Sequence, residues 1–294
     1  MEIEEQLQWA RDFRKKIEAD EIDYFFPKKD YEIDKQEIVI PTDFGDTRIL
    51  VYRPNSSKPL PAFINLHGGG FVVGSADGDD PWCRLIAVEA GCAVYNVDYR
   101  LAPENKFPIA IEEIYSISKY LFNHAHEFEI DPARIAIGGH SAGGNLATAV
   151  CLFNIERGNE IPFIYQIMDY PVLDLLTRPE EKPRFAESIS VELGKMFRIC
   201  YFNNPEEAKN PLASPVYAKN LQNMPPALII TAERDSLAKE AEIYADMLKE
   251  AGVPVVHKDY KGLPHGFNFN GEDFDAALDS WHLMARQLKN AFGE

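Results

Sequence analysis

The chain has 294 residues, 46% of them hydrophobic and 26% charged, and its formal net charge at pH 7 is −17. This composition is ordinary for a globular protein that buries a substantial core. An excess of acidic residues repels nucleic acid and anionic membranes, so we exclude both as partners.

The hydrophobic pattern predicts an N-terminal helix over residues 3–19, followed by strands and helices in alternation. Two short strands, 37–40 and 47–53, flank a turn at 43–46 and indicate a hairpin. The remaining expected strands are 61–67, 92–99, 134–138, 163–168, 227–231 and 254–260, and the remaining expected helices are 82–90, 107–126, 142–156, 237–251 and 273–292. This alternation predicts an α/β fold with a mostly parallel sheet of about eight strands and helices on both faces.

The segment 171–217 interrupts the alternation. It is too long for a connection and has its own helical pattern around residues 190–202, so we interpret it as an insertion that caps the sheet. The N-terminal arm has an unusual aromatic content, and either a helix packed on the core or a flap over an apolar pocket fits this pattern. Its aromatic residues are Trp9, Tyr24, Phe25 and Phe26. We expect one domain over residues 1–294, with a cap formed by about 1–35 and 171–217.

Ser141 is the candidate nucleophile. It is the central residue of a G-x-S-x-G pattern, Gly139 to Gly143, between an expected strand and an expected helix. A serine in a strained turn needs neighbours without side chains, so that strand and helix can pack closely and Oγ stays accessible. The helix also directs N–H groups and the positive end of its dipole at an oxyanion formed there. A Gly/Ser-rich phosphate or packing turn is the alternative, and a P-loop is excluded because no Lys-Ser/Thr pair follows the glycines.

The other chemical groups follow other strands of the expected sheet. Ligands of open parallel sheets bind beyond the carboxyl ends of the strands. The glycines 68–70, Asp235 and His265 all follow such ends, in the chain order Ser, Asp, His of an α/β-hydrolase. We therefore expect His265 to act as the base and Asp235 to fix its tautomer. Backbone N–H groups of the glycine run and of Ala142 would receive the oxyanion.

Several other residues compete for these roles. Asp174 follows the preceding strand and is the alternative acid. Among the histidines, we expect His67 to anchor the glycine loop and His140 to form a wall of the site. Metal hydrolysis would need clustered histidine and carboxylate ligands, and no such spacing is present, so we expect neither a metal nor a cofactor.

The motifs together resemble those of the hormone-sensitive-lipase-like family of α/β-hydrolases, which includes bacterial acetyl esterases and other short-acyl carboxylesterases. They are His67-Gly68-Gly69-Gly70-Phe71, Asp98-Tyr99-Arg100-Leu101-Ala102-Pro103-Glu104 with Phe107-Pro108, Gly139-His140-Ser141-Ala142-Gly143-Gly144-Asn145 and His265-Gly266-Phe267. The resemblance implies the α/β-hydrolase fold with a cap and a triad of Ser141, Asp235 and His265. It further implies an oxyanion hole formed by Gly69, Gly70 and Ala142.

This sequence departs from the family's pattern at two places. The residue before the serine is often aspartate in the family and is His140 here. The acid motif often continues Asp-Pro-Leu-Arg-Asp-Glu, whereas here residues 235–240 read Asp-Ser-Leu-Ala-Lys-Glu. Both departures concern the substrate rather than the catalytic groups. Arg100 and Glu104 are carried over as a polar pair that fixes a loop.

These observations predict a serine carboxylesterase that hydrolyses small, short-acyl esters through an acyl-enzyme without a cofactor. Phe71 and His140 are the candidate pocket residues. An amidase or formamidase of the same fold would share this chemistry, and a non-catalytic small-molecule receptor is a further alternative. The expected partner is a small ester, and the sequence is also compatible with a homodimer.

The cysteines and the N-terminus indicate the compartment. Cys83, Cys92, Cys151 and Cys200 form no C-x-x-C pair, and the second and third fall in expected strand or helix interiors, where cysteine serves as a small apolar residue. Residues 1–16 are charged throughout and lack the apolar core of a signal peptide, and no apolar run is long enough to span a membrane. We therefore expect a cytoplasmic protein with reduced thiols.

Overall fold

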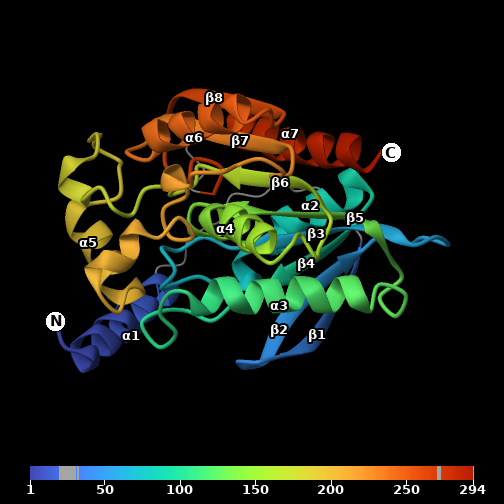
Figure 1. Cartoon of the computed structure of the whole chain (residues 1–294), viewed down its shortest axis with the longest axis horizontal. Coiled ribbons are helices and arrows are strands. Elements are labelled where there is room, and N and C mark those ends of the chain that lie inside the picture. The colour runs from blue at the N-terminus through green and yellow to red at the C-terminus, as the bar shows by residue number, and fades with distance from the viewer. Residues whose placement is uncertain (20–30, 32, 270–272, 294) are drawn as a thin grey trace.

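A computed structural model of the chain describes residues 1–19, 31, 33–269 and 273–293 (Figure 1). Its strands are β1 (Asp34–Thr42), β2 (Gly45–Arg53), β3 (Leu60–Leu66), β4 (Ala93–Val97), β5 (Ile130–His140), β6 (Phe163–Asp169), β7 (Ala227–Arg234) and β8 (Val255–Pro264). Its α-helices are α1 (Ile3–Ala19), α2 (Asp80–Ala90), α3 (Ile109–Asn123), α4 (Ala142–Glu156), α5 (Val191–Tyr201), α6 (Ala238–Glu250) and α7 (Phe274–Phe292).

The strands form one eight-stranded sheet in the order β1-β2-β4-β3-β5-β6-β7-β8. β1 and β2 form the expected antiparallel hairpin, and β2 is also antiparallel to β4. From β4 to β8 all neighbours are parallel. The expected α/β fold with a mostly parallel sheet is confirmed, and parallel pairing brings the carboxyl ends of β3, β5, β7 and β8 to one edge of the sheet.

The sheet separates two hydrophobic clusters. In β7, Ala227 and Ile229 join the cluster that contains α3, α4 and α6, whereas Leu228 and Ile230 join the cluster that contains α2 and α7. Successive side chains of a strand point to opposite faces, so strands covered by helices on both faces are apolar at most positions. This explains why the central strands read as continuous apolar runs without alternation.

The segment between β6 and β7 contains α5, which begins after Ser190, whose side chain accepts a hydrogen bond from the N–H of Leu193. At the left of Figure 1, α5 lies beside α1, where the rings of Trp9 and Phe13 both contact Phe197. Residues 20–30, which include Tyr24, Phe25 and Phe26, lie outside the described residues. The described aromatic residues of the arm pack against α5.

Two further features concern the thiols and the lengths of the apolar helices. The four cysteines are buried free thiols. Among the residues that the structure describes, no helix combines the length and apolar character needed to cross a bilayer.

Candidate active site

Ser141 occupies a strained turn between β5 and α4. Its φ is 54° and its ψ is −115°, a backbone conformation that residues other than glycine rarely adopt. A Cβ atom at Gly139 or at Gly143 would lie far inside van der Waals contact with the carbonyl oxygen of Leu66. The two motif glycines therefore allow the turn to pack directly on β3, which presents the serine at the edge of the sheet.

His265 and Asp235 come from the ends of β8 and β7 and meet at this serine. The Nε2 atom of His265 lies 2.9 Å from Oγ of Ser141, and its Nδ1 atom lies 2.7 Å from Oδ2 of Asp235. The other carboxylate oxygen of Asp235 accepts a hydrogen bond from the N–H of Leu237 at 3.0 Å. Because Asp235 accepts from Nδ1–H, the proton is held on Nδ1, and Nε2 is left free to accept the serine proton.

The protonation of His265 is set by opposing effects. Burial lowers the pKa of His265, but the charge of Asp235 and its hydrogen bond raise it, and the net pKa lies above the ordinary value for histidine. An imidazole of this kind is a stronger base than histidine in water. It is also more easily left protonated at mildly acidic pH.

Asp174, the alternative acid, is engaged elsewhere. Its oxygens accept hydrogen bonds from the N–H groups of Leu176 and Thr177, from the Thr177 hydroxyl and from the hydroxyl of Tyr217, at 2.6–3.2 Å. The carboxylate thus stabilises its own turn and makes no hydrogen bond to His265. The geometry brings together Ser141, His265 and Asp235 and leaves Asp174 outside.

The glycine loop after β3 lies beside Ser141. Gly69 and Gly70 both adopt positive φ, 115° and 61°, and a Cβ atom at Gly70 would overlap the ring of Phe197. Within the described part of the chain, the N–H groups of Gly69 and Gly70 donate no hydrogen bond. Ala142 is the first residue of α4, where N–H groups also lack a partner in the helix. All three N–H groups are therefore available to an oxyanion.

His67 anchors this loop, as expected. Its Nδ1 atom donates to the carbonyl oxygen of Gly68 at 2.7 Å, its ring stacks on Tyr99, and the Tyr99 hydroxyl donates to the His67 carbonyl at 2.8 Å. Burial lowers the pKa of His67, which favours the neutral ring.

His140 forms a hydrogen bond to the same loop. The N–H of Gly68 donates to its Nε2 atom at 3.0 Å, and the same nitrogen lies 3.1 Å from Oδ1 of Asp79. Asp79 is buried and also accepts from Nδ2 of Asn65 at 2.7 Å. Burial raises the pKa of Asp79, but the neighbouring imidazoles of His140 and His67 and the hydrogen bond from Asn65 together lower it by more, so the pKa lies below the ordinary value. The sequence predicted a wall at His140 but gave no signal for Asp79.

Two cavities meet at Ser141. The first has a volume of about 330 Å³ and is lined mainly by the segment 172–198, with Phe71 and Leu237. The second, of about 670 Å³, is lined by α1, the glycine loop, His140, His265 and Phe269. Phe71 is almost completely buried and stacks on Tyr201 with ring centroids 3.9 Å apart. The two candidate pocket residues therefore belong to different cavities.

The expectation that Arg100 and Glu104 pair with each other is wrong. Arg100 forms an ion pair with Glu113 and donates to the hydroxyl of Thr47 at 3.1 Å. Glu104 instead accepts two hydrogen bonds of 2.8 Å from Arg14 of α1. Glu113 lies on α3 and also accepts a hydrogen bond of 2.8 Å from the backbone N–H of Arg100. Glu104 is thereby left to fasten α1 to the body.

Among the residues that the structure describes, no three or more histidine, cysteine or carboxylate side chains are grouped so that they could hold a metal ion. The chemical groups that meet at this site are the Ser141 hydroxyl, the His265 imidazole, the Asp235 carboxylate and the nearby backbone N–H groups.

Comparisons with known proteins identify the family to which this fold belongs. The model of the α/β hydrolase fold family matches residues 63–269. An arylesterase from Saccharolobus solfataricus is 34% identical over 222 residues, which cover 74% of this chain and 72% of the relative. An ethyl acetate hydrolase from Pseudomonas putida is 34% identical over 247 residues, which cover 82% of this chain and 77% of the relative. A hyperthermophilic esterase from the archaeon Pyrobaculum calidifontis superposes with a TM-score of 0.83 at 35% identity, over 96% of this chain and 93% of that structure.

Proposed function

This chain belongs to the hormone-sensitive-lipase-like family of α/β-hydrolases and is a carboxylic ester hydrolase, and we propose that it cleaves small, short-acyl esters with Ser141 as the nucleophile. The observation that carries this proposal is the chain of hydrogen bonds from Ser141 through His265 to Asp235, 2.9 Å and 2.7 Å long. Distances of this kind are those of a serine activated by a general base.

The reaction follows from these contacts. His265 takes the proton of Ser141 while Oγ attacks the ester carbonyl carbon, and the N–H groups of Gly69, Gly70 and Ala142 receive the negative charge on the carbonyl oxygen. The C–O bond to the alcohol then breaks, and His265 gives the proton to the departing oxygen. Water, deprotonated by the same imidazole, releases the acid from the acyl-enzyme.

The two cavities take different parts of the ester. His265 has to reach the oxygen of the leaving alcohol, and His265 lines the second cavity but not the first. The alcohol part therefore occupies the second cavity, and the acyl part occupies the first. A volume of about 330 Å³ lies at the low end for small-molecule sites, which favours short acyl groups.

We further propose one catalytic domain over residues 1–294, capped by about 1–35 and 171–217. The contacts of α1 and α5 support the cap. Nζ of Lys106 donates to Gln6 of α1 at 2.6 Å and to the carbonyl oxygens of Ile199 and Phe202 at the end of α5 at 3.1 and 2.9 Å. One lysine of the body thus fastens both cap segments.

The proposal is tested by fluorophosphonate labelling and by hydrolysis of a series of nitrophenyl esters of increasing acyl length. We expect the wild type to be labelled and Ser141→Ala to be unlabelled, folded and slower by roughly 10⁶-fold. Ser118→Ala is the matched control, because Ser118 lies inside α3 and donates only to the carbonyl oxygen of Ile114. Near-wild-type turnover by Ser141→Ala would refute the assignment. Matched amides separate an amidase from an esterase, and a folded wild type that is neither labelled nor active on any ester would refute the catalytic assignment and favour the receptor alternative.

A further inference from the structure

The first cavity has an unusual charge distribution for so acidic a chain. Its lining contains three cations, Lys182, Arg184 and Arg198, and two carboxylates, Asp174 and Glu192. Nζ of Lys182 donates to Glu240 at 2.6 Å and to the carbonyl oxygen of Asp174 at 2.7 Å, so its charge is neutralised inside the protein. The two arginines differ from this lysine, because neither has such a partner among the described residues.

Arg198 lies on α5 and is half-buried. Its Nε atom is buried without a hydrogen-bond partner, and its guanidinium forms no ion pair with any residue in the described ranges. The nearby carboxylates are occupied, since Glu180 pairs with Lys195 at 3.5 Å and Glu181 pairs with Arg178. Burial lowers the pKa of Arg198, as expected for a charge that is partly removed from water and not compensated. An unpaired cationic donor of this kind is costly unless a ligand satisfies it.

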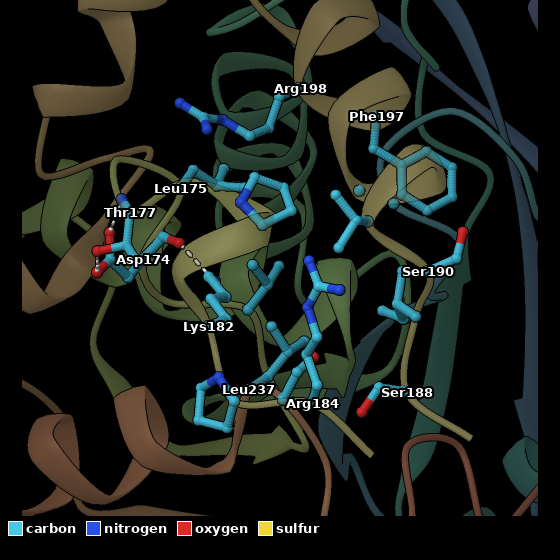
Figure 2. A pocket seen from close by; sticks show the side chains of 18 of the residues that line it. Asp174, Leu175, Thr177, Lys182, Arg184, Ser188, Ser190, Phe197, Arg198 and Leu237 are labelled. Atoms are coloured by element: carbon cyan, nitrogen blue, oxygen red, sulfur yellow. Dashed lines mark hydrogen bonds between the residues drawn. The ribbon is translucent and has the colours of Figure 1, made fainter. Parts of the chain in front are cut away.

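Arg184 lies on another side of the same cavity. Figure 2 shows its guanidinium extending between Lys182 and Ser188 toward the middle of the ring of lining side chains, with Arg198 at the upper edge. Arg184 also has no hydrogen bond or ion pair within the part of the chain that the structure covers. In the second cavity, by contrast, the arginine is Arg14, whose guanidinium is saturated by Glu104 and two carbonyl oxygens.

We propose that the first cavity binds an acyl group that ends in a carboxylate, as in the monoester of an aliphatic dicarboxylic acid, with Arg198 and Arg184 pairing with that carboxylate. The planar guanidinium matches a carboxylate through two parallel hydrogen bonds, which a neutral acyl chain cannot offer. This inference rests on the proposed function, because the cavity assignment depends on His265 protonating the alcohol.

The reaction itself is unchanged. The serine oxygen forms a bond to the ester carbonyl carbon, the bond to the alcohol oxygen breaks, and water releases a dicarboxylate. The distal carboxylate does not react. Its role is to orient the acyl chain and to neutralise the two arginines.

The test compares acyl chains that differ only in the terminal group. The substrates are the mono-4-nitrophenyl esters of glutaric, adipic and pimelic acids, each beside the neutral 4-nitrophenyl ester of equal chain length. The proteins are the wild type, Arg198→Gln, Arg198→Lys and Arg184→Gln, with Arg286→Gln on α7 as the control, because Arg286 is exposed and lines neither cavity.

We expect the wild type to prefer at least one anionic ester over its neutral counterpart. Arg198→Gln should lower kcat/KM for that ester about ten- to a hundredfold, as for the loss of a hydrogen bond between charged groups, and should change the neutral ester by less than about twofold. Arg198→Lys should recover part of the loss, Arg184→Gln should show a smaller one, and Arg286→Gln should show none. Thermal unfolding should show all variants folded, since neither cavity arginine has a partner to lose among the residues that the structure describes.

A second arm places the carboxylate on the alcohol side, with 4-carboxyphenyl acetate beside phenyl acetate. Arg198→Gln should leave this ratio unchanged, and a change in it would overturn the acyl-side assignment. The inference is also overturned when the wild type hydrolyses the neutral esters but no anionic ester shows a preference that depends on Arg198. If the wild type hydrolyses none of the esters, phenyl acetate included, the proposed function itself fails.

Discussion

Replacing Asp235 by Asn tests the catalytic geometry with the smallest change in shape. Asp235 accepts from Nδ1–H of His265 at 2.7 Å and from the N–H of Leu237 at 3.0 Å. An asparagine can keep the contact to Leu237 through its oxygen, but it then presents its NH₂ group to the ring. The ring must accept at Nδ1 and carry its proton on Nε2, which faces Ser141, and a protonated Nε2 cannot take the serine proton. We expect kcat to fall by about 10⁴-fold.

The pH profile separates this mechanism from unfolding. The pKa of His265 is raised in the wild type, so kcat/KM should rise with pH through a limb above the ordinary histidine value of about 6.5. Asp235→Asn removes the charge that raises this pKa and leaves the burial that lowers it, so its limb should move to lower pH. Asp174→Asn is the comparison, because it loosens a turn without touching His265. A larger loss of kcat in Asp174→Asn than in Asp235→Asn would refute the reasoning.

Two further predictions concern the turn and a buried acid. In Gly143→Ala the new methyl group would overlap the carbonyl oxygen of Leu66, so the turn must open, and urea unfolding should show a loss of about 1–3 kcal/mol together with most of the activity. Burial raises the pKa of Asp169 to about 7. A raised folded-state pKa contributes stability below the unfolded-state value of about 3.9, and this contribution is lost as pH rises through about 7. Between pH 5 and 8 the free energy of unfolding, measured with urea, should therefore fall less in Asp169→Asn than in the wild type, because the variant has no carboxyl group at this position to titrate.

The sequence predicted the sheet and the groups at its edge because both depend on local patterns. Strands buried on both faces are apolar at most positions, and the glycines around Ser141 are required by the close approach to Leu66. Asp235 and His265 could be found because parallel strands deliver the residues after their ends to one place. The boundaries were less accurate: β5 begins at Ile130, four residues before the expected start, because Ile130 pairs with Leu60 across a register shift.

The polar contacts that hold the loops and the helix around the site could not be predicted in the same way. Asp79 contacts His140, although 61 positions of the chain separate the two residues. Arg14 contacts Glu104 across a separation of 90 positions. No local pattern specifies which polar side chains meet across such separations, and the family motif suggested a different partner for Glu104. For the same reason, the sequence could not show that Arg198 lacks a carboxylate partner among the residues described by the structure. Whether a side chain has an ion-pair partner depends on all the segments that pack around it in the folded protein.

The arrangement of Phe197 links the cap to the catalytic loop. Its ring lies where a Cβ atom of Gly70 would be, and on its other sides it contacts Trp9 and Phe13 of α1. Phe197 immediately precedes Arg198 on α5, so the helix that carries the unpaired arginine also packs on a glycine proposed to bind the oxyanion. An acyl carboxylate that draws Arg198 toward the cavity would therefore press on the same helix that confines Gly70. If the two proposals hold, adjacent residues of one helix would couple occupation of the proposed acyl cavity to the geometry of the proposed oxyanion hole, and substrate selection would appear in kcat as well as in KM.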